Sequence, residues 1–85
     1  ALGRAADALA DAKLARDGFA KSKQPTSAAD AQLVVADALW LQGGAQHKRE
    51  AIAEAKLALQ TVEAQPKPDP EVIAAARAWL AKHAP

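Results

Sequence analysis

At 85 residues, 51% of them hydrophobic, the chain is expected to form one small domain, and its formal net charge of +1 disfavours a nucleic-acid-binding protein. It has no cysteine, which excludes disulfides and thiolate metal sites. No apolar run approaches the roughly 18 residues that span a bilayer, so no membrane span is expected. Twenty-five alanines, with few β-branched or aromatic residues, predict an all-α fold.

The first half of the chain predicts two helices. Apolar residues recur every three or four positions from Leu2 to Phe19, which indicates an amphipathic helix. After a short loop, Ser27 is a favoured N-cap, and a second helix is expected from there to about Gln42, before two glycines. Its apolar residues cover more than one face. This helix is therefore expected to touch neighbours on two sides or to present an apolar face to a ligand.

The second half predicts two more helices. A third helix is expected over residues 46–64, with its buried seam at Ile52, Ala55, Leu59 and Val62 and with Ala51 and Ala58 beside it. Asp69 and Pro70 are typical of an N-cap and a first helical position, so a fourth helix is expected to start there. The inner face of this helix is predicted to consist of Val72, Ile73, Ala76, Trp79 and Leu80, with His83 continuing it.

Connections of about four residues make consecutive helices antiparallel neighbours. Four antiparallel helices can form either stacked helical hairpins or a small four-helix bundle, and the pattern fits both. The whole of residues 1–85 is interpreted as a single helical domain. Because the chain starts with Ala1 rather than methionine, we expect it to be part of a longer polypeptide of bacterial type.

Residues 31–63 resemble one repeat of the tetratricopeptide family. Ala36 matches the small residue in the middle of the first helix, Gly43 matches the turn, and Ala51 and Ala58 match the alanines of the second helix. Gln32 and Ala55 depart from the pattern, since the family often has tryptophan and an aromatic residue there. The resemblance implies stacked helical hairpins that bind a protein segment along the first helix of each pair.

Five residues of the second predicted helix form the candidate partner-binding site: Asp30, Leu33, Asp37, Trp40 and Leu41. The resemblance implies this set, and the spacing of three, four and three residues between the first four independently places those four on one helical face. The aspartates favour a basic or amphipathic protein segment as the partner. Leu33 and Trp40 fit core positions equally well, in which case the aspartates lie at the edge of the core.

We expect a protein-interaction module rather than an enzyme, with no catalytic residue, no cofactor and no metal. The few hydroxyl groups include Thr26 and Ser27, which helix capping explains, and the two histidines are 36 residues apart. Two alternatives remain open from the sequence. One is a self-associating bundle that forms a homodimer, and the other is a regulatory domain of a larger bacterial signalling protein.

Overall fold

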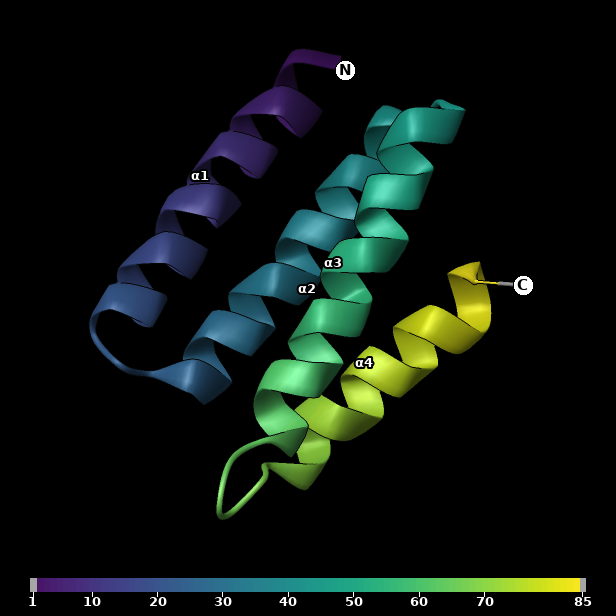
Figure 1. The fold of residues 1–85 in the computed structure, drawn as a ribbon. Coiled ribbons are helices and arrows are strands. Elements are labelled where there is room, and N and C mark those ends of the chain that lie inside the picture. Colours follow the sequence, from purple (N-terminus) through teal and green to yellow (C-terminus); the bar gives the residue numbers. More distant parts are fainter. Residues whose placement is uncertain (1, 85) are drawn as a thin grey trace.

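The computed structural model describes residues 2–84 and the side chains of residues 7–84, so the side chain of Leu2 lies outside the described part. Its elements are four helices, namely α1 (Leu2–Lys21), α2 (Pro25–Gln42), α3 (Ala45–Glu63) and α4 (Pro70–His83). No strand occurs among the described residues. The predicted all-α fold of four helices is confirmed, and consecutive helices run in opposite directions (Figure 1).

The four helices form an open stack rather than a closed bundle. Each helix packs on the next, and α4 also reaches α2, but among the described residues the backbone of α1 lies against α2 alone. In a closed four-helix bundle the first and last helices would also meet. The result is a flat molecule of 39 × 29 × 17 Å. It exposes 5386 Å² of surface, more than the about 4,800 Å² of a compact protein of this mass.

The core between the helices is built mostly from alanine. Among the residues whose side chains are described, ten of the 14 buried apolar residues are alanines, and the others are Val35, Leu39, Val62 and Val72. Leu9, Leu33, Trp40, Trp79 and Leu80 are half-buried and pack around the larger of two core clusters. Because alanine has the smallest apolar side chain, the helices can approach closely, and the larger side chains close the edges of the contact.

The buried seam of α3 differs from the predicted one. The buried residues of this helix are Ala51, Ala55, Ala58 and Val62, whereas Ile52 and Leu59 are only half-buried. Ala55 and Val62 were therefore predicted correctly. The predictions for Ile52 and Leu59 were wrong, because the buried residue lies one position earlier in each case, at Ala51 and Ala58. The alanines occupy the line where α2 and α3 come closest, so the bulkier aliphatic side chains lie at its border.

The start of α2 corrects a second prediction, because the helix begins at Pro25 and not after Ser27. Lys23 adopts a left-handed φ of 56°, and the Gln24 N–H donates to the Phe19 carbonyl at 2.9 Å, which closes α1. The chain can then re-enter a helix directly at Pro25, whose ring fixes a helical φ. The predicted stop after Gln42 is confirmed.

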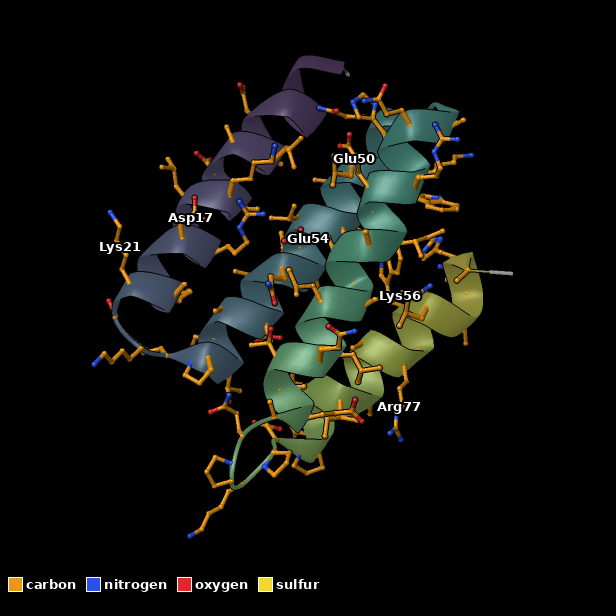
Figure 2. The ribbon with its side chains drawn as sticks, viewed as in Figure 1. Asp17, Lys21, Glu50, Glu54, Lys56 and Arg77 are labelled. Atoms are coloured by element: carbon orange, nitrogen blue, oxygen red, sulfur yellow. The ribbon has the colours of Figure 1, made fainter. Side chains whose placement is uncertain are left out.

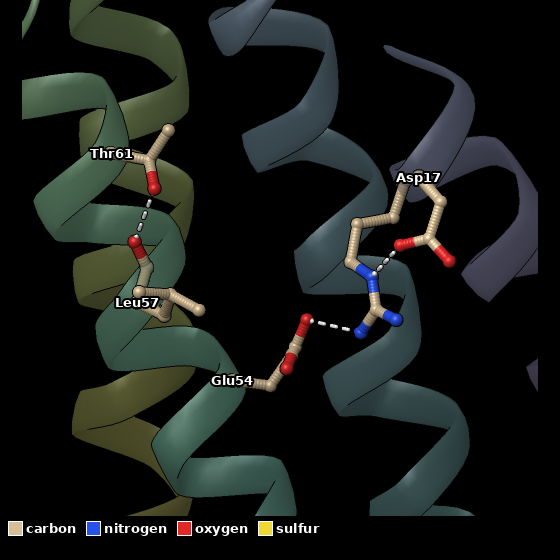
Figure 3. A network of polar contacts seen from close by, with 5 residues as sticks. Asp17, Glu54, Leu57 and Thr61 are labelled. Atoms are coloured by element: carbon tan, nitrogen blue, oxygen red, sulfur yellow. Dashed lines mark hydrogen bonds and ion pairs between the residues drawn. The ribbon is translucent and has the colours of Figure 1, made fainter. Parts of the chain in front are cut away.

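An ion pair joins α1 to α3 across the gap between them. The Arg16 guanidinium donates from Nη1 to Glu54 at 2.9 Å and from Nε to Asp17 at 3.0 Å (Figure 3). The hydrogen bond to Glu54, more than any other contact, raises the pKa of Arg16 above its ordinary value. Lys21 and Arg77 project from opposite edges of the molecule, and Arg77 pairs with Glu63 at 3.0 Å (Figure 2). Arg16 is therefore held in place in its charged form.

Replacing Asp69 with alanine is expected to lower the free energy of unfolding by about 1 kcal/mol. The Asp69 carboxylate accepts hydrogen bonds from the backbone N–H groups of Glu71 at 2.9 Å and Val72 at 3.4 Å, and it caps α4 as predicted. Urea denaturation followed by circular dichroism measures the loss. Asp69→Asn keeps the acceptor oxygen and should remain close to wild type. Equal stability of wild type and Asp69→Ala would show that the cap contributes nothing.

Candidate functional site

One line of side chains on α2 stays open to solvent, although the helix has neighbours on its other sides. α2 packs against α1, α3 and α4, and eight of its residues are buried. Asp30, Val34, Asp37 and Leu41 are all exposed, and Val34 and Leu41 keep 55% and 69% of their surface. Their spacing of four, three and four residues aligns them on one side of the helix. We call these four residues the α2 stripe.

The structure divides the five residues predicted from the sequence. Asp30, Asp37 and Leu41 belong to the α2 stripe, whereas Leu33 and Trp40 are half-buried and pack against the core. The sequence analysis did not single out Val34 among the apolar residues that cover more than one face of the second predicted helix. Its position, four residues after Asp30 and seven before Leu41, was a signal that could have identified it.

Trp40, Trp79 and His83 form an aromatic cluster that joins α2 to α4. The two indole rings meet edge to face, with centroids 5.9 Å apart and an interplanar angle of 88°. The His83 ring lies 4.4 Å from Trp40 and 4.2 Å from Trp79. Aromatic pairs favour such edge-to-face contacts beyond the effect of burial alone. The predicted position of His83 beside Trp79 is confirmed, and the cluster fixes α4 against the end of α2.

The aromatic cluster also positions charged groups beside the α2 stripe. The indole Nε1–H of Trp79 donates to an Asp37 carboxylate oxygen over a long distance of 3.4 Å. The ammonium of Lys48, in the first turn of α3, lies 4.9 Å from the centroid of the Trp40 ring, within the range of a cation–π contact. Asp37 is thus oriented by a neighbouring helix while its side chain remains exposed to solvent.

A shallow groove of about 470 Å³ borders the α2 stripe on the side of α1. Its α1 wall consists of Ala12, Ala15 and Phe19, and its α2 wall includes Asp30 and Val34, which also belong to the stripe. Most of the lining is apolar. The stripe and the groove together form a continuous surface in which carboxylates alternate with aliphatic and aromatic side chains.

The side chains of this surface offer apolar contact and negative charge. Among the residues that the structure describes, no three His, Cys, Asp or Glu side chains are grouped so that they could hold a metal ion. None of the described helices is both long and apolar enough to cross a membrane. Comparisons with protein-family models, with curated proteins and with solved structures find no match to this chain.

Proposed function

We propose that this protein is a non-catalytic interaction module that binds an amphipathic, basic helix of a partner protein along the α2 stripe. The observation that carries the proposal is the alternation of acidic and aliphatic side chains on the open side of a helix that is otherwise covered. Exposed aliphatic residues flanked by charges are typical of docking surfaces. The carboxylates of Asp30 and Asp37 would select a basic partner.

The spacing of the stripe defines the partner further. Asp30 and Asp37 are seven residues apart, as are Val34 and Leu41, which corresponds to about 10 Å along a helix. Lysine or arginine residues seven positions apart on a partner helix have the same separation. Aliphatic residues between them would contact Val34 and Leu41. The complementary sequence is therefore a heptad-spaced basic helix laid beside α2.

The surroundings of the stripe support this mode of binding. The groove beside it adds apolar surface from Phe19, and the long hydrogen bond from Trp79 favours one orientation of Asp37. The resemblance of residues 31–63 to a tetratricopeptide repeat points to the same helix, because partners of that family lie along the first helix of each pair. In this interpretation α2 is that first helix and α3 is the second.

A designed helical peptide with lysines seven residues apart and leucines between them tests the proposal. We expect it to bind, and we expect the double substitution Asp30→Asn with Asp37→Asn to weaken binding about fivefold at low salt. The difference should shrink at high salt, where surface charges are screened. Fluorescence anisotropy of the labelled peptide measures both effects. The double substitution Asp7→Asn with Asp11→Asn, at exposed aspartates on α1, is the matched control.

Absence of peptide binding, or equal weakening by the stripe and control variants, would contradict the proposal. Self-association through the same stripe is the competing explanation, since Val34 and Leu41 are exposed. In a two-fold dimer the stripe would face itself and place four carboxylates in one contact, with no cation among the stripe residues to pair with them, which is unfavourable. We therefore expect a monomer by light scattering at low micromolar concentration. A dimer that Leu41→Asp disperses would instead assign the stripe to self-association.

A further inference from the structure

A second groove lies on another side of α2, between α1 and α3. It has a volume of about 390 Å³, and residues from α1, the loop after it, α2 and α3 line it. The ion pair between Arg16 and Glu54 crosses one end of it, and Lys23 lies at the other end. The α2 stripe contributes no residue to its lining, so this groove is distinct from the surface described above.

Gln32 forms part of the floor of this groove and is the one buried polar residue among those described. Its exposed fraction is 8%, and its Oε1 atom has no hydrogen-bond partner among the described residues. A buried amide without a partner lowers stability, and a leucine at this position would avoid the loss. Gln32 lines the groove, and rotation about its soft last torsion exchanges the positions of the amide oxygen and nitrogen.

Lys23 at the opposite end is also held at a cost to stability. Its φ of 56° lies in the left-handed region, where glycine is the favoured residue at the end of a helix. Its side chain is exposed, and its ammonium forms no ion pair with any residue that the structure describes. Arg16, by comparison, is already bound to both Glu54 and Asp17. Lys23 is therefore the cation in this groove that can attract an anionic ligand.

The middle of the groove is apolar and has a defined length. Ala20, Ala28 and Leu57 line it, and Leu57 keeps 48% of its surface exposed. From Pro25, near Lys23, to Gln32 the helix advances seven residues, or about 10 Å. An extended peptide covers that distance with about three residues. The groove thus has an amide at one end, aliphatic surface in the middle and a cation at the other end.

We propose that this groove binds the C-terminal residues of a peptide chain. A peptide group supplies both the donor and the acceptor that the Gln32 amide can pair with. An aliphatic side chain of the ligand packs on Leu57, Ala20 and Ala28, and the terminal carboxylate pairs with Lys23. Capture of a C-terminal carboxylate beside a pocket for an aliphatic side chain is a common mode of peptide recognition.

The probe for this proposal is acetyl-Ala-Leu-Ala with a free carboxylate, titrated into the ¹⁵N-labelled full chain. We expect the amide resonances of Ala20, Gln32 and Leu57 to shift with saturation, and we expect the C-terminally amidated peptide to bind about tenfold more weakly. Shifts confined to the α2 stripe, equal binding of the two peptides, or no binding at millimolar concentration would each overturn the proposal.

Substitutions separate a binding role of Gln32 from a structural one. Gln32→Leu should raise the Tm by about 5 °C and yet weaken peptide binding about tenfold, whereas Gln60→Leu on the exposed part of α3 should leave binding unchanged. Lys23→Gln should weaken binding of the free acid to the level of the amidated peptide, and Lys21→Gln should not. If Gln32→Leu lowered the Tm, or if it bound the peptide like wild type, Gln32 would be a packing residue and the proposal would fail.

Discussion

Replacing Ala55 with leucine is expected to lower the free energy of unfolding by about 1–3 kcal/mol. Ala55 has no exposed surface and lies on the line where α3 packs against α2. Three added carbon atoms have no space there unless the two helices move apart, which would also loosen the contacts of Val35 and Ala36. Guanidinium denaturation monitored by circular dichroism measures the change in midpoint.

Ala53→Leu is the matched control for this substitution. Ala53 is exposed on the same helix, so the same three carbon atoms enter solvent there and the free energy of unfolding should stay within about 0.5 kcal/mol of wild type. Equal behaviour of the two variants would mean that the helices of the core can separate without loss. It would contradict the conclusion that alanine is needed at the contact between α2 and α3.

Replacing Trp79 with alanine should lower the free energy of unfolding by about 2 kcal/mol, roughly half the effect expected for a fully buried aromatic residue. The half-buried indole packs on the core, meets Trp40 edge to face and donates to Asp37. α4 has few other contacts with α2 besides that of His83, so its attachment to α2 depends largely on Trp79. Urea denaturation measures the loss, and limited proteolysis should show faster cleavage within α4.

Trp79→Phe preserves an aromatic ring but removes the indole N–H. We expect it to retain more than half of the stability that Trp79→Ala loses, because ring packing contributes more than one long, exposed hydrogen bond. If Trp79→Ala were cleaved within α4 at the same rate as wild type, α4 would be held in place by α3 alone. The contacts of Val72 and Ala76 would then have to account for its position.

The sequence predicted the helices well because their signals are local. Alanine content, the period of apolar residues, the two glycines after Gln42 and the Asp69–Pro70 pair act within a few residues. The predicted N-cap at Ser27 was wrong because the way in which α1 ends decides where α2 begins. The end of α1 is closed by Lys23 and Gln24, and that geometry lets α2 begin at Pro25.

The candidate site could be predicted only in part. Spacing placed Asp30 and Asp37 on one face, but it could not decide which edge of a broad apolar arc is covered by α4. Which edge is covered depends on packing between helices far apart in the sequence. This packing leaves Leu33 and Trp40 half-buried, while Val34 stays exposed. The buried Gln32 was unforeseen for the same reason, since polarity alone predicts exposure.

An alanine core has a further consequence for how the protein responds to temperature. The heat-capacity change of unfolding follows the apolar surface that becomes exposed, and alanine contributes less of it than leucine, isoleucine or phenylalanine. The free energy of unfolding therefore curves less with temperature than it would for a protein of equal length with a bulky core. Such a protein loses less stability on cooling below its temperature of maximum stability than a protein of equal length with a bulky core.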